Sequence, residues 1–67
     1  MQYEKVRKVF QQHPRTAFTA AQVAIYAGVN DRVVRSVMLS MLDEEVIVDL
    51  GRGHEDNSRM YVLKEKN

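Results

Sequence analysis

The chain has 67 residues, of which 45% are hydrophobic and 28% are charged, a balance typical of a small globular domain rather than of a disordered segment. Its formal net charge of +1 argues against a strongly basic nucleic-acid coat protein and equally against an acidic mimic of DNA. The absence of cysteine excludes disulfides, cysteine-based zinc fingers and thiol chemistry, and it fits a reducing compartment. We therefore expect one domain over residues 1–67, held together by a well-packed core.

Two features of the sequence bear on membranes. Nowhere does it approach the ~20 consecutive apolar residues that a membrane-spanning helix needs. The N-terminal residues, Met-Gln-Tyr-Glu-Lys, carry no apolar core after their charges and do not predict a signal peptide. We expect a soluble, cytoplasmic protein without a membrane partner.

Apolar residues at helical spacing predict an amphipathic first helix over about residues 2–13, which Pro14 ends. A short extended link follows. The second helix, over about residues 20–27, has the clearest start, because Thr19 is followed three positions later by Gln22 in a capping box.

A third helix is predicted over about residues 31–45, with Asn30 as its N-cap. Most of its apolar residues fall on half of its circumference, and Leu39 is the exception that lies among polar side chains. β-Branched residues and a polar loop that contains glycine then predict a β-hairpin over about residues 46–63.

The predicted class is therefore mainly α with a small β-hairpin, an α+β fold. Residues 20–39 fit the helix-turn-helix pattern, in which Ala24 is small where two helices cross and Gly28 makes the turn between them. The further markers, in chain order, are residues 19–24, residues 28–30, Val34, Met38, Met41, Leu42 and residues 46–47. With these markers the chain resembles the winged helix-turn-helix DNA-binding domains, the group that includes the MarR-type and other small bacterial, plasmid and phage transcription regulators.

Two positions depart from that resemblance. Such families often have a glycine where the third helix meets the first wing strand, and this chain has Glu45 there. We therefore expect a different or strained exit turn. Leu42 replaces the glutamate or lysine common at its position, which implies either a slightly larger core or an exposed apolar spot.

The resemblance implies that the third helix enters the major groove of DNA and that the hairpin is a wing lying on the backbone or in the minor groove. Arginine can bond guanine with two hydrogen bonds, and helix N-termini accept phosphate. The residues implied in the recognition helix are Asn30, Arg32, Arg35 and Ser36. Those implied in phosphate or wing contacts are Arg15, Thr19, Gln22, Arg52, His54 and Arg59.

Plainer roles stay open for several of these residues. Arg32 and Arg35 could be simple solvent-facing helix residues, and Asn30 could be only an N-cap. Thr19 and Gln22 are capping residues first, and any contact with phosphate is secondary.

Other positions carry similar alternatives. Glu55 and Asp56 would repel phosphate beside His54. Leu39 could contact a thymine methyl group or a partner protein, or it could simply be exposed.

The net charge conceals a pattern along the chain. Residues 1–18 carry four basic residues against one acidic residue, a sum of +3. Residues 19–51 carry two against five, a sum of −3, and residues 52–67 carry four against three, a sum of +1. The positive charges of the middle segment lie at the start of the third helix and most of its negative charges at the far end. This distribution is compatible with DNA binding of modest affinity, because few phosphates would be neutralised.

Two functions are consistent with these observations. The first is sequence-specific binding of double-stranded DNA by a small transcription regulator, acting as a monomer, as a weak homodimer through the first helix, or cooperatively on repeated sites. The alternative is a protein-interaction module or an anti-repressor-type adaptor, which binds a larger transcription-related partner and does not contact DNA directly.

Catalysis is not predicted. The sequence shows no Ser-His-Asp arrangement, no phosphate-binding loop and no paired-carboxylate motif. His13 and His54 have no second set of ligands nearby, so we expect neither a metal site nor a cofactor. No small-molecule site is evident.

Overall fold

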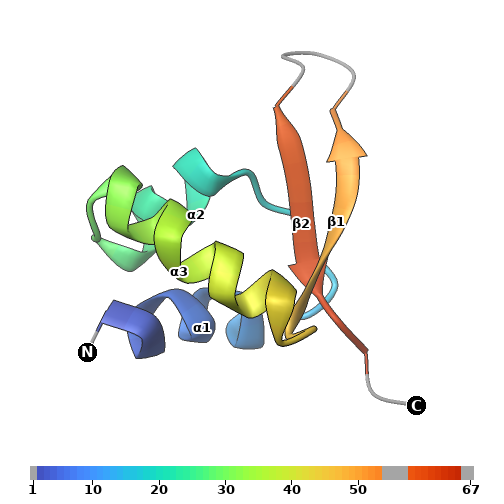
Figure 1. The fold of residues 1–67 in the computed structure, drawn as a ribbon, viewed down its shortest axis with the longest axis horizontal. Helices are drawn as coiled ribbons and strands as arrows, with labels where there is room; N and C mark the ends of the chain where they lie inside the picture. The colour runs from blue at the N-terminus through green and yellow to red at the C-terminus, as the bar shows by residue number, and fades with distance from the viewer. Residues whose placement is uncertain (1, 54–57, 66–67) are drawn as a thin grey trace.

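The structure, a computed structural model, describes residues 2–53 and 58–65. Three helices, α1 (Gln2–Gln12), α2 (Ala20–Ala27) and α3 (Asp31–Asp43), pack together, and an antiparallel hairpin of β1 (Ile47–Arg52) and β2 (Arg59–Leu63) stands beside them (Figure 1). This architecture confirms the predicted α+β class. In the described part of the chain, no helix is long and apolar enough to cross a membrane.

Local side-chain chemistry explains where α2 and α3 begin. The Thr19 hydroxyl accepts a hydrogen bond from the Gln22 backbone N–H at 3.1 Å, and the Gln22 side-chain oxygen accepts one from the Thr19 N–H at 2.9 Å. This is the predicted capping box. Gly28 ends α2 with a φ of 66°, in the left-handed region where glycine carries no steric penalty. Asn30 caps α3 by accepting a hydrogen bond from the Arg32 N–H at 2.8 Å.

The exit from α3 is strained, as the departure from the glycine-bearing pattern predicts. The helix ends at Asp43, before the predicted limit of Glu45, and Glu45 itself has a φ of 60°. The Glu45 N–H donates to the Leu42 carbonyl at 3.1 Å and the Val46 N–H donates to the Met41 carbonyl at 2.8 Å. These two bonds form a Schellman motif, which normally carries glycine at the left-handed position. Leu42 is partly buried against the core, so the larger core is the outcome at that position.

The hairpin contains an irregularity that bends its first strand. Val48 pairs with Val62 and Asp49 pairs with Tyr61, but Met60 pairs with Gly51, so Leu50 is an extra residue in β1. Gly51 has a φ of 89°, and its N–H donates to the Asp49 carboxylate at 2.8 Å. The carboxylate of Asp49 thus stabilises the bulge.

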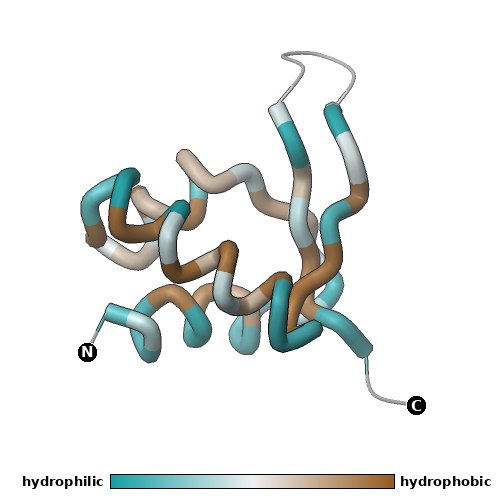
Figure 2. The backbone as a smooth tube through the Cα atoms, viewed as in Figure 1, coloured by the Kyte–Doolittle hydropathy of each residue, from teal (hydrophilic) through white to brown (hydrophobic). Residues whose placement is uncertain are grey.

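The core lies between the helices and the base of the hairpin. Every helix and the first strand contribute to it, and in Figure 2 the hydrophobic stretches of α1 face α3 while its hydrophilic ones face outward. The buried apolar residues are Val6, Val9, Phe10, Phe18, Val23, Val29, Val34, Met38, Met41 and Ile47. Because α1 and the link after it supply four of these residues, α1 is the support on which the helix-turn-helix rests.

Candidate nucleic-acid interface

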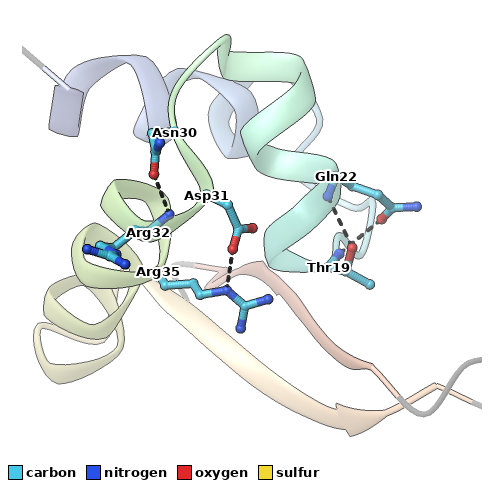
Figure 3. A network of polar contacts seen from close by, with 6 residues as sticks. All are labelled: Thr19, Gln22, Asn30, Asp31, Arg32 and Arg35. Carbon is cyan, nitrogen blue, oxygen red and sulfur yellow. Dashed lines mark hydrogen bonds and ion pairs between the residues drawn. The ribbon is translucent and has the colours of Figure 1, made fainter.

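The two arginines of α3 point in different directions. At 3.6 residues per turn, positions three apart are separated by about 60° around the helix. Val34, Met38 and Met41 define the buried side of α3, and Arg32 lies nearly opposite to them whereas Arg35 lies on the flank. In Figure 3, Arg32 points away from α2, and the guanidinium of Arg35 points toward the start of α2.

The outward side of α3 forms a stripe along the helix. Arg32, Ser36 and Leu39 succeed one another at four and three positions, and all three are exposed. Leu39 is 68% exposed in spite of its apolar side chain. We call Arg32, Ser36 and Leu39 the outward stripe.

Arg35 is held in place from within its own helix. Its Nε donates a hydrogen bond to Oδ2 of Asp31, one turn earlier, at 2.7 Å (Figure 3). This hydrogen bond and the charge of Asp31 raise the pKa of Arg35 above its ordinary value. Both side chains remain at least half exposed, so the guanidinium stays accessible to a partner.

A small hollow of about 170 Å³ lies beside Arg35. Three residues that the sequence assigns to different parts of a DNA interface meet here: Thr19 before α2, Arg35 on α3 and Arg59 on β2. The full lining is Thr19, Ala20, Ala21, Arg35, Ser58, Arg59 and Tyr61. We call this the arginine hollow.

The start of α2 gives the arginine hollow an electropositive wall. The first N–H groups of a helix have no carbonyl partner within the helix, and the helix dipole adds positive potential there. In α2 the capping box uses the N–H of Gln22, while Ala20 and Ala21 line the hollow. Two arginines and a helix N-terminus therefore face one small space, an arrangement suited to an anion.

A second pair of arginines lies at the described end of the wing. Arg52 and Arg59 are direct cross-strand partners, and both are exposed. Like charges on direct cross-strand partners repel each other. An ion pair between Nη1 of Arg59 and Oδ2 of Asp49, at 3.2 Å, reduces this repulsion. His54, also predicted in the wing, lies outside the described residues.

Arg15 is the predicted residue that the structure places apart. It lines a separate groove of about 1070 Å³ between α1, the exit of α3 and the end of β2, together with Arg7, Glu44 and Lys64. The arginine hollow and the outward stripe do not include it.

Two acidic residues at the C-terminal end of α3 contact residues of α1 and of the segment after β2, not Arg32 or Arg35. The hydroxyl of Tyr3 donates to Oε1 of Glu44 at 2.9 Å, and Nζ of Lys64 lies 3.0 Å from Oε1 of Glu45. The hydrogen bond to Glu44 raises the pKa of Tyr3 above its ordinary value. Two of the carboxylates predicted to lie far from phosphate, Glu44 and Glu45, therefore contact Tyr3 of α1 and Lys64 after β2.

Sequence reasoning missed Asp31, Asp49 and Tyr61 as parts of this region. The spacing of four between Asp31 and Arg35 was a usable signal, because such pairs meet on a helix surface. The roles of Asp49 and Tyr61 depend on strand register and had no local signal. Across residues 2–53 and 58–65, the structure shows no cluster of three or more histidine, aspartate or glutamate side chains that could hold a metal ion.

Comparison with known proteins supports the fold. No family model matches the sequence, and no curated protein matches it. Among solved structures, the chain is similar to ZitR of Lactococcus lactis, a mutant in its apo form, with a TM-score of 0.76 and 16% sequence identity. The match covers 92% of this chain and 47% of that one, so the chain spans about half the length of the solved protein. The three helices and antiparallel hairpin of this chain form a winged helix-turn-helix fold.

Proposed function

We propose that this chain binds double-stranded DNA sequence-specifically as a small transcription regulator, with α3 in the major groove and the hairpin against the backbone. The observation that carries this proposal is the arginine hollow, where Arg35, Arg59 and the start of α2 converge. The outward stripe of α3 adjoins it. Two arginines and a helix N-terminus beside an exposed helix face suit a duplex, which presents phosphates at the edges of a readable groove.

The geometry favours different tasks for the two arginines of α3. Arg32 lies on the outward side of the helix, where a side chain can reach the O6 and N7 acceptors of guanine. Ser36 follows one turn later and can contact the neighbouring base pair. Arg35 lies on the flank beside Arg59 and is better placed to hold a backbone phosphate.

The remaining predicted contacts extend from these two surfaces. The side-chain oxygen of Asn30 is used by the cap, so its NH₂ group is the part that can contact DNA. Thr19 and Gln22 hold the start of α2 in shape. Arg52 extends the positive surface along the wing, with His54 as a further predicted contact. Arg15 lies in a separate groove, so a phosphate contact by Arg15 would be separate from the one at the arginine hollow.

A random-sequence selection with duplex DNA and the purified chain tests the proposal. We expect enrichment of a short site, with a binding constant that falls with salt at a slope of about −3 on logarithmic axes, as for three phosphate contacts. Two-fold symmetry in the enriched site would support a weak homodimer through α1. Failure to enrich any site, together with a salt slope near zero, would contradict the proposal.

Exposed Leu39 favours a second candidate, a protein-interaction module or adaptor without direct DNA contact. An apolar residue that is 68% exposed at the C-terminal end of the outward stripe is also suited to a protein groove. Under this candidate the salt slope is near zero, and Leu39→Asp abolishes capture of the partner. Under the DNA-binding proposal Arg32→Ala changes the selected sequence, which the second candidate does not predict. A resemblance to the MarR-type group and a cytoplasmic location remain predictions.

A further inference from the structure

The contact between Asp31 and Arg35 leaves one edge of the guanidinium available. Oδ2 of Asp31 accepts from Nε, at 2.7 Å. Arginine has five N–H donors in a rigid planar fork, and the four on Nη1 and Nη2 lie at the opposite end of the group from the chain. With Nε engaged, the guanidinium is oriented, and no hydrogen bond or ion pair from residues 2–53 or 58–65 engages its Nη atoms. Two acceptors of a ligand can therefore meet the Nη edge at once.

The hydrogen bond from Arg35 to Asp31 matters for binding because of the direction in which the Nη edge then points. Arg35 lines the arginine hollow with Thr19 and Arg59, and Figure 3 shows its guanidinium turned toward the start of α2. A long side chain that must be ordered on binding loses affinity, and one held beforehand loses less. Because Asp31 lies on the same helix one turn earlier, the orientation does not depend on the position of the wing.

We propose that Asp31 is a positioning residue, which holds the guanidinium of Arg35 so that its Nη edge binds the oxygens of a DNA backbone phosphate in the arginine hollow. This inference rests on the proposed DNA-binding function. It assigns a role in DNA binding to Asp31, although the negative charge of its carboxylate by itself would oppose DNA binding.

The two roles of Asp31 predict effects of opposite sign. A carboxylate near phosphate repels it, so removal of the charge alone strengthens binding. Loss of the hydrogen bond releases Arg35, which weakens binding. Where positioning outweighs repulsion, removal of Asp31 weakens binding when Arg35 is present, and it leaves binding equal or tighter when Arg35 is absent.

A double-mutant cycle measures this difference. Asp31→Ala is made with Arg35 present and in the Arg35→Ala background, and affinity is measured for the duplex recovered by selection and for a random-sequence duplex of equal length. We expect Asp31→Ala to weaken binding about threefold or more when Arg35 is present, and to leave it equal or tighter when Arg35 is absent. Because a phosphate contact is independent of sequence, both duplexes should show the same pattern.

Two further variants separate positioning from charge. Asp31→Glu keeps a carboxylate within reach of Arg35 and should restore binding to within about twofold of the original chain. Asp43→Ala removes an equal charge from the other end of α3 and should tighten binding slightly in both backgrounds. Thermal unfolding of each variant confirms that the domain is folded at the temperature of the binding measurement.

An independent measurement needs no DNA. The proton–nitrogen NMR correlation of the Arg35 Nε–H group should be sharp and slow to exchange in the original chain and in Asp31→Glu, and broadened in Asp31→Ala. This readout keeps the inference testable even where Asp31→Ala destabilises the first turn of α3.

The possible failures are distinguishable. Tighter binding by Asp31→Ala in both backgrounds, or a broad Nε–H signal in the original chain, would overturn the positioning role and leave the proposed function standing. Weakening confined to the selected duplex would also overturn the phosphate assignment, because it would place Arg35 on a base. If the original chain enriches no duplex, the proposed function fails and the inference with it.

Discussion

Phe18 and Tyr61 exchange both of their backbone hydrogen bonds, each at 2.8 Å. This isolated bridge joins the residue before the cap of α2 to the middle of β2, as the course of the link beside β2 shows in Figure 1. The side chain of Phe18 is buried and meets the ring of Phe10 edge-on, at 5.8 Å between centroids. Since Thr19 follows Phe18 and Arg59 lies two residues before Tyr61, the bridge brings the helix N-terminus and the wing arginine to one place.

The different directions of Arg32 and Arg35 predict different defects. We expect Arg32→Ala to cost about 1–3 kcal/mol on the selected duplex and to relax the sequence preference at one position, as for a lost base contact. We expect Arg35→Ala to weaken binding to all duplexes and to reduce the salt slope by about 1, as for a lost phosphate contact. Gel-shift titrations over a salt series, followed by repeated selection with each variant, measure both effects. Unchanged affinity of Arg35→Ala would remove Arg35 from the interface.

The capping box of α2 predicts a stability effect that precedes any effect on DNA. Thr19→Ala removes the hydroxyl that accepts from Gln22 and should lower the free energy of unfolding by about 0.5–2 kcal/mol. Thr19→Ser keeps the hydroxyl acceptor and should lower the free energy of unfolding by less than Thr19→Ala does. Urea unfolding followed by circular dichroism measures the difference. Equal stability of the alanine and serine variants would contradict the capping role.

The left-handed conformation of Glu45 predicts that glycine is the better residue there. The left-handed region costs a residue with a Cβ about 1–2 kcal/mol, and glycine avoids this cost. Glycine also loses the exposed contact with Lys64, which contributes little. We expect Glu45→Gly to exceed Glu45→Ala in unfolding free energy by about 1 kcal/mol, because both variants lose the carboxylate and only alanine keeps the strain. Urea titrations of the two variants make the comparison, and a more stable alanine variant would refute it.

The hydrogen bond from Tyr3 to Glu44 predicts a change of stability at alkaline pH. The pKa of Tyr3 is raised from 10.0, so the folded state holds the phenolic proton more strongly than the unfolded chain. The stabilisation is therefore complete below pH 10.0 and is lost as the pH rises through the raised folded pKa. We expect Tyr3→Phe to be less stable than the original chain near neutral pH and to converge with it at strongly alkaline pH.

Absorbance of tyrosinate provides the direct check on Tyr3. The original chain should show a tyrosine titration with a raised pKa, and this titration should be absent from the Tyr3→Phe variant. Glu44→Gln removes the neighbouring negative charge and should move the pKa of Tyr3 back toward its ordinary value. Glu44→Ala removes the acceptor as well, and if Tyr3 titrates unchanged in both variants, Glu44 is not the cause of the shift.

Local interactions made much of the fold predictable. The capping box at Thr19, the exit at Gly28 and the cap at Asn30 depend on partners within four residues, and the structure shows each of them. The resemblance predicted a different or strained exit at Glu45, and the positive φ of Glu45 shows that the strained alternative is the one present. The end of α3 was predicted too late, since the Schellman bonds that close it begin at Met41 and Leu42.

The sequence by itself determined the order of the elements, their caps and the apolar faces that build the core, because each depends on short-range geometry. It also placed arginines at the start of α3 and in the wing. Helix geometry alone separates the directions of Arg32 and Arg35 and places Asp31 one turn before Arg35. Only the tertiary structure decided that Arg35 meets Thr19 and Arg59 at one hollow. That meeting depends on how α2 packs against α3 and on a bulged strand register, which residues distant in sequence set together.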